Sequence, residues 1–175
     1  MKKVIAVLAL VLAAGAALFL LNRPPAPFDP AELTPAETVL SYPGAELSLE
    51  ISGRQVALTF SNHSGARLDT GVAVGTVRER FFFGGLDVFL DGRWYQVPHK
   101  DIATVGMGLE LEPGDSVSGA YSFAGYGDLP DGRYRISFGY REYDPALDVP
   151  NSQRPYYETY TEFLVEDGQY TLPAG

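Results

Sequence analysis

The chain of 175 residues is long enough for one domain of ordinary size with a short attachment. It contains no cysteine, which excludes disulfides, a thiol nucleophile, a thiolate metal site and a lipid attached to cysteine. Its formal net charge of −9 argues against nucleic acid as a partner and is typical of a soluble surface outside the cytoplasm.

Residues 1–21 are predicted to be a signal peptide or a signal-anchor transmembrane helix. Two lysines precede an uncharged run at residues 4–21, which is the layout of an export signal. A helix of that length spans about 27 Å, close to the hydrocarbon thickness of a bilayer. We expect an uncleaved anchor in the cell membrane, with the lysines inside and the remainder outside. The alternative is cleavage near Ala16, which would give a secreted protein.

Residues 22–43 form a Pro-rich linker, with Pro24, Pro25, Pro27 and Pro30 near its start. Proline favours extended conformations and few apolar residues accompany it. We therefore expect a semi-extended spacer that holds the following domain away from the membrane surface.

Residues 44–168 carry the alternation of apolar and polar side chains that is typical of half-buried strands. A symmetric hairpin about residues 52–54 directs six apolar side chains to one face, which predicts an antiparallel sheet with its other face in water. The predicted cross-strand pairs are Ile51 with Val56, Leu49 with Leu58 and Leu47 with Phe60.

The stretch 81–98 predicts a central hairpin about Asp91-Gly92, because both inner positions of a type I′ turn need a positive φ and Gly92 supplies one of them. This turn pairs Phe89 with Trp94 and Val88 with Tyr95. Both faces are apolar, so Trp94 has a structural role, but the alternation leaves open which face points to the core.

A second corner precedes the strand that begins near Gly132. Tyr134 follows this glycine and resembles the tyrosine corner of Greek-key sandwiches, in which the hydroxyl bonds back to the loop backbone. Strand and turn signals recur every ~8–12 residues without long helices between them. The sequence therefore predicts an all-β, antiparallel, immunoglobulin-like sandwich of about seven to nine strands, preceded by an N-terminal hydrophobic helix and followed by a C-terminal tail at residues 169–175.

Several of these segments together resemble a bacterial immunoglobulin-like domain over about Leu47 to Val165. They are Leu86-Asp87, the run from Asp91 to Pro98, the run from Leu111 to Ser116, the corner from Leu129 to Ile136, and Glu162-Phe163. The resemblance implies a stand-alone sandwich in an exported, membrane-tethered protein. It implies no activity, because sandwich folds carry many functions.

The titratable residues give no pattern of a catalytic, cofactor or metal site. His63 and His99 lie in polar turn segments, and no third ligand has metal-site spacing. Asp144, Asp148 and Asn151 are the nearest approach to a calcium loop. No nucleophile elbow or phosphate-binding glycine loop is present. We therefore expect no enzymatic activity, the alternative being a hydrolase with an unusual pair of carboxylates.

Tyrosine and arginine gather about the penultimate loop, at Tyr143, Arg154, Tyr156, Tyr157 and Tyr160. These two residue types are enriched at binding surfaces, and loops at one end of a sandwich carry recognition. We interpret them as a binding loop for an unknown envelope protein or polymer. The alternatives are cross-strand tyrosine packing at this place and, for the whole protein, a secreted ligand-binding or inhibitor-like domain.

Overall fold

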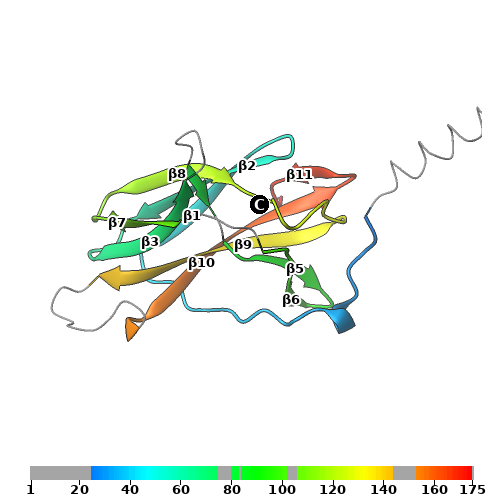
Figure 1. Cartoon of the computed structure of the whole chain (residues 1–175), viewed down its shortest axis with the longest axis horizontal. Coiled ribbons are helices and arrows are strands. Elements are labelled where there is room, and N and C mark those ends of the chain that lie inside the picture. Colours follow the sequence, from blue (N-terminus) through cyan, green and yellow to red (C-terminus); the bar gives the residue numbers. More distant parts are fainter. Residues whose placement is uncertain (1–24, 75–79, 83, 102–105, 144–152, 175) are drawn as a thin grey trace, which may run out of the picture.

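The computed structural model describes residues 25–74, 80–82, 84–101, 106–143 and 153–174 (Figure 1). The apolar segment at residues 4–21, and with it the predicted N-terminal helix, lies outside this part. Within the described ranges no helix is long and apolar enough to cross a membrane. These ranges are otherwise strands, turns and one short 3-10 helix, η1 (Pro30–Glu32). The expectation of an all-β domain is confirmed.

Eleven strands occur in the described residues, more than the seven to nine expected, because several short strands lie between the long ones. They are β1 (Ala45–Ser52), β2 (Gln55–Asn62), β3 (Arg67–Val74), β4 (Arg80–Phe82), β5 (Leu86–Leu90), β6 (Arg93–Gln96), β7 (Gly106–Leu111), β8 (Ser116–Tyr121), β9 (Gly132–Tyr143), β10 (Tyr156–Glu166) and β11 (Gln169–Thr171).

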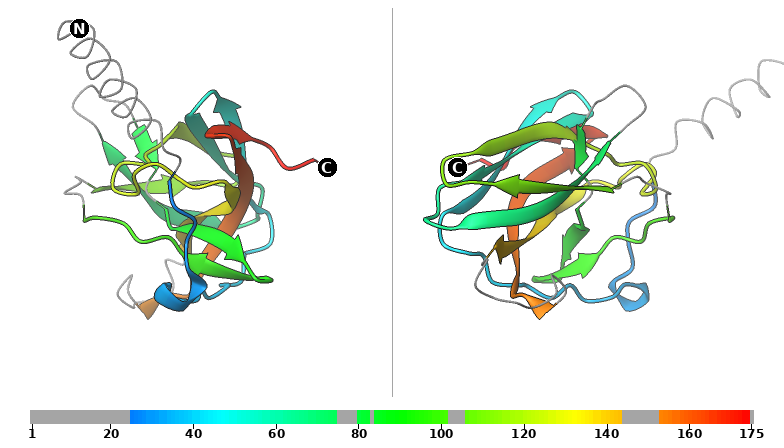
Figure 2. Two further views of the ribbon diagram at one scale, coloured as in Figure 1. Left: turned by 90° about the vertical axis from the view of Figure 1, so that its right-hand side faces the viewer. Right: turned by 60° about the vertical axis from the view of Figure 1, so that its left-hand side comes forward.

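The strands form one sheet folded into two layers (Figures 1 and 2). The first layer contains β1, β2, β8 and β4, and the second contains β6, β5, β9, β10 and β11. Strand β3 joins the layers, because its first residues pair with β9 and its last residues pair with β4, and β7 pairs with β3. Among the residues that the structure describes, all strand pairings are antiparallel except that of β4 with β8. The architecture is the expected sandwich, with one parallel contact that the sequence did not indicate.

Aromatic side chains from both layers meet in the core. The ring of Phe60 on β2 lies 4.8 Å from that of Phe138 and 5.0 Å from that of Tyr140, both on β9. Phe82, on β4, packs edge-on against Phe138. All four side chains are buried, so the layers are held together by burial of large apolar surface.

The two predicted hairpins have the expected registers. Strands β1 and β2 pair Leu47 with Phe60, and β5 and β6 pair Phe89 with Trp94. Asp91 and Gly92 have φ values of 49° and 83°, as a type I′ turn requires. Val88 belongs to the core, whereas Trp94 is half-buried on the outer face.

The tyrosine corner is also confirmed. Tyr134 is buried on β9 and its hydroxyl donates a 2.7 Å hydrogen bond to the backbone oxygen of Pro130. This bond ties the loop before β9 to the strand itself, so the loop cannot move without exposing a buried hydroxyl.

The chain beyond residue 168 does not leave the domain as a tail. Strand β11 pairs with the end of β10, and Tyr170 is buried. Its ring lies 5.4 Å from Phe163 and 5.2 Å from Phe123. The sandwich therefore extends to Thr171, because Tyr170, two positions past the expected boundary at residue 168, completes one end of the core.

The described part of the Pro-rich linker packs on the sandwich and is not a free spacer over its whole length. Residues 34–42, which we call the strap, begin antiparallel to β6 through a bridge between Pro35 and Tyr95. The strap then crosses the second layer toward β10 (Figure 1). Strand β6 lies at the edge of its sheet, and extended backbone can form hydrogen bonds with such an edge. This explains why the strap packs on the domain although a free spacer was expected.

Candidate functional site

The outer surface of the second layer is polar and aromatic, in contrast to its core face. Along β10, Thr159, Phe163 and Val165 are buried, whereas Tyr156 and Glu158 belong to the opposite parity, which faces outward. The neighbouring strand β9 contributes arginines to the same face. Arg141 lies opposite Tyr156 in the register, and Arg135 lies opposite Glu162.

The structure divides the five residues of the predicted binding loop between two faces. Tyr156 and Tyr160 lie together on the outer face of β10. Tyr143 and Arg154 lie beyond them near β3, with the guanidinium of Arg154 5.0 Å from the ring centroid of Tyr143 and 3.3 Å from Asp69.

Tyr157 lies on the inner side of β10 instead. Its ring packs 5.1 Å from that of Tyr42 and 6.0 Å from that of Tyr140. The reason is the two-residue period of a strand, which sends adjacent side chains to opposite faces. Tyr157 therefore packs against the core and is separated from the other four residues.

Glu158 is held in a fixed position at the centre of the outer face. The hydroxyl of Tyr156 donates to its Oε1 at 2.8 Å and that of Tyr160 donates to its Oε2 at 2.6 Å. Burial, followed by the hydrogen bond to this carboxylate, raises the pKa of Tyr160 to about 12 and also raises the pKa of Tyr156. Both hydroxyls therefore remain protonated donors at neutral pH.

A buried ion pair lies beside this carboxylate. Arg135 Nε donates to Asp87 Oδ2 at 2.8 Å, and the two side chains are only 5% and 10% exposed. The rings of Trp94 and Tyr160 flank the guanidinium at 4.7 and 4.2 Å. Desolvation raises the pKa of Asp87 against the opposing effect of Arg135. The pair was not singled out from the sequence, although both residues fall on predicted strands.

The strap covers this pair and is held mainly through backbone groups. Only Ala36, Val39 and Tyr42 in the strap are half-buried, and Leu40 is 82% exposed. Its hydrogen bonds run from Gln96 N to Thr34 O (2.9 Å), from Ala36 N to Trp94 O (3.0 Å), from Val39 N to the Tyr160 hydroxyl (3.0 Å), from Glu158 N to Leu40 O (3.3 Å) and from Arg135 Nη1 to Thr38 Oγ1 (3.3 Å).

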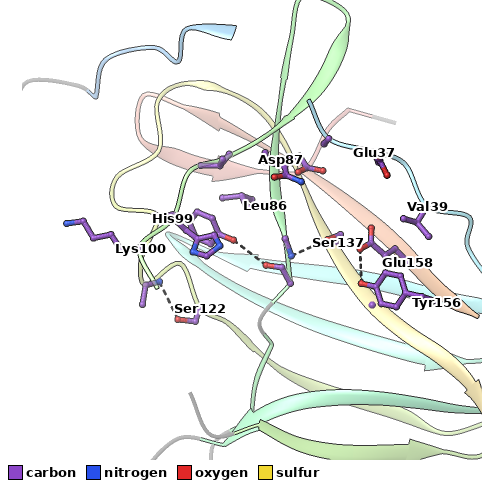
Figure 3. Close-up of a pocket in the computed structure, with 18 residues that line it drawn as sticks. Glu37, Val39, Leu86, Asp87, His99, Lys100, Ser122, Ser137, Tyr156 and Glu158 are labelled. Atoms are coloured by element: carbon purple, nitrogen blue, oxygen red, sulfur yellow. Dashed lines mark hydrogen bonds between the residues drawn. The ribbon is translucent and has the colours of Figure 1, made fainter. Parts of the chain in front are cut away.

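A groove of about 790 Å³ opens between the strap, the start of β5, the loop after β6 and the outer face of β10. Figure 3 shows His99 and Lys100 on one side of it and Glu37, Tyr156 and Glu158 on the other. Asp87 lines the groove near Glu37 and Glu158, but its charge is compensated by Arg135.

Glycines form the floor of the groove where the chain passes from β4 in the first layer to β5 in the second. A Cβ at Gly84 would lie 1.7 Å from the backbone oxygen of Ser137, and one at Gly139 would lie 2.1 Å from the Tyr156 hydroxyl. Gly85 N donates to Ser137 Oγ at 3.1 Å. The absence of side chains at these positions lets the crossing chain and Tyr156 approach β9 closely.

The other residues considered from the sequence do not converge. His63 is exposed and 3.7 Å from Glu46, whereas His99 lies edge-on to Tyr126 beside the groove. The residues proposed as a calcium loop, Asp144, Asp148 and Asn151, lie outside the described ranges. Within those ranges no three His, Asp or Glu side chains are grouped as metal ligands would be. The lining of the groove itself offers hydrogen-bonding groups and two tyrosine rings to a ligand.

A sequence model described as a bacterial Ig-like domain matches residues 45–150. The match runs from β1 through the central hairpin and the tyrosine corner, and it confirms the resemblance found in the sequence. The strap and β10, which form two sides of the groove, lie outside the matched residues. No curated protein matches the chain.

Proposed function

Because the chain belongs to the bacterial Ig-like domain family, we propose that it is a non-enzymatic binding module that acts outside the cytoplasm. A sandwich fold supplies a scaffold, and its function depends on the sites that a particular chain carries on it. In this chain the groove, whose walls include the strap and β10, is the candidate site. A net charge of −9 and an export-type N-terminus fit this location.

We place the module at the cell membrane, anchored through residues 4–21. The strap begins 13 residues after the end of this segment, so the groove would lie within about 45 Å of the membrane surface. N-terminal sequencing of protein from the membrane fraction tests the anchor: retention of residue 1 supports it, and a mature start between Ala14 and Arg23 replaces it with the secreted form.

The partner is an envelope protein or polymer that contacts the groove and the outer face of β10. One observation carries this proposal: Glu158, fixed by two tyrosine hydroxyls, lies on the wall of a groove of ligand-binding size. Such a carboxylate is orientated before a ligand arrives, so little side-chain entropy is lost on binding.

The test is capture of envelope components by the full-length protein from cross-linked cells. Tyr156→Ala removes a ring that is 45% exposed on the groove wall and should lose the captured component. The matched control is Tyr157→Phe, one residue away on the core side, which should retain it. Equal capture by Tyr156→Ala and the wild type would contradict the proposal.

A further inference from the structure

The groove offers both hydrogen-bond acceptors and donors along its whole length. Carboxylates on one side can only accept, whereas hydroxyl and amide groups can do both and an ammonium group can only donate. These groups come from the strap, from β6, from β9 and β10 and from two loops. The polar side chains that line it are Glu37, Asp87, Gln96, His99, Lys100, Ser122, Ser137 and Glu158, of which Asp87 is already paired with Arg135.

Two tyrosine rings also line the groove, Tyr126 from the loop after β8 and Tyr156 from β10. The hydroxyl of Tyr126 donates to Gly84 O at 3.3 Å, and that of Tyr156 donates to Glu158. Both rings are therefore fixed in orientation by their hydroxyls. Rigid amphipathic rings of this kind supply contact area at low entropy cost.

The charges around the groove disfavour an anionic ligand. Glu37 and Glu158 lie on one wall, and the whole chain carries nine more negative than positive charges. The polar lining equally disfavours a lipid, because an acyl chain would bury these groups without hydrogen-bond partners. A cationic ligand would meet the ammonium group of Lys100 on the opposite side of the groove. We therefore consider a ligand that is uncharged, donates and accepts hydrogen bonds, and has apolar patches that can lie on a ring.

We propose that the groove binds a neutral glycan, a short segment of a chain of pyranose sugars. Sugar hydroxyls donate to the fixed carboxylate of Glu158 and accept from Gln96 and Lys100, while their C–H faces lie on the tyrosine rings. The volume of about 790 Å³ falls within the roughly 300–1,000 Å³ typical of ligand sites. This assignment rests on the proposed binding function and names its ligand class.

The experiment is calorimetric titration of the full-length protein in a polyoxyethylene detergent, which has no sugar headgroup to compete. The probes are N-acetylated chitotetraose and cellotetraose, with tetraglycine and tetralysine as peptide probes. We expect saturable binding of at least one tetrasaccharide and weaker or absent binding of both peptides. The better sugar identifies whether acetamido or plain hydroxyl groups are preferred.

Three variants test whether the sugar binds in the groove. Glu158→Ala should weaken tetrasaccharide binding by about ten-fold or more, since a hydrogen bond to a charged group is lost. Gln96→Ala, at an exposed position on the edge of β6, should weaken it without disturbing the two tyrosines that Glu158 holds. Glu162→Ala is the matched control, because this carboxylate lies on the same face but pairs with Arg133 and does not line the groove.

Three results would overturn the glycan assignment: no binding of either tetrasaccharide, binding unchanged by both Glu158→Ala and Gln96→Ala, or tighter binding of a peptide probe than of both sugars. If no sugar binds while Tyr156→Ala still loses an envelope component in the capture experiment, the binding function stands and only the ligand class is wrong. If both experiments fail, the binding function is wrong as well.

Discussion

Replacement of Arg135 by leucine should destabilise the domain far more than a surface arginine would. The substitution leaves the carboxylate of Asp87, which is 10% exposed, without its only salt-bridge partner in the described residues. Breaking a buried pair from one side costs about 3–5 kcal/mol, because a buried charge remains uncompensated. The matched control is Arg133→Leu. Arg133 pairs with Glu162 on the same face, but this pair is more exposed, so its loss should lower the free energy of unfolding by about 1 kcal/mol or less.

The effect should depend on pH in a defined direction. Desolvation already raises the pKa of Asp87, and loss of Arg135 removes the interaction that opposes this rise. A carboxyl whose pKa is higher in the folded state loses stability as pH rises through that pKa, so the variant should recover stability as the pH is lowered from 7 toward 4. Asp87→Asn in the Arg135→Leu background should likewise recover much of the loss at pH 7.

Urea unfolding followed through the single tryptophan, Trp94, measures both effects, since this residue lies against Arg135. A loss at pH 7 no larger than that of Arg133→Leu would refute the assignment of a buried pair. So would a loss of equal size at pH 4 and pH 7, because the cost would then not come from the charge of Asp87.

Three further predictions concern the scaffold. Tyr134→Phe should lower the free energy of unfolding by about 1–3 kcal/mol, since a buried hydrogen bond to Pro130 is lost, and unchanged urea unfolding would contradict this. Gly84→Ala should lower the thermal midpoint markedly because its Cβ would overlap the backbone of β9, whereas Gly65→Ala, with open space around it, should not. Stability should also fall as the pH rises above 10, because the pKa of Tyr160 is near 10 in the unfolded chain but about 12 in the folded protein. If the tyrosine absorbance of the folded protein titrated at the same pH as that of the unfolded protein, this prediction would be wrong.

The strap changes how the linker should be regarded in any work on this protein. Its residues Ala36, Glu37 and Val39 form one wall of the groove, and Arg135 donates to its backbone at Glu37. A shortened protein that starts at residue 44 would lose this wall and uncover the Arg135–Asp87 pair. Binding experiments therefore require a chain that includes the strap.

The sequence by itself determined the features that depend on neighbouring residues. Alternation and turn chemistry were sufficient for the registers of the β1–β2 and β5–β6 hairpins, and a glycine-bearing corner was sufficient to place Tyr134. The alternation along β10 would also separate Tyr157 from Tyr156, but the interpretation from the sequence placed both in one binding loop, and the structure corrected it. Each of these is a local signal, because strand period and turn type are set by backbone geometry over a few residues.

Only the tertiary structure decided which face of the central hairpin is covered and what lies on the other. Trp94 and Val88 obey the same alternation, and it is the packing of the first layer that buries Val88 and leaves Trp94 beneath the strap. Asp87 and Arg135 are 48 residues apart, and the groove draws its walls from segments spread between residues 36 and 158. The two-residue period of a strand determines which side chains share a face. The contacts that cover that face come from distant parts of the chain, and a local sequence pattern does not reveal them.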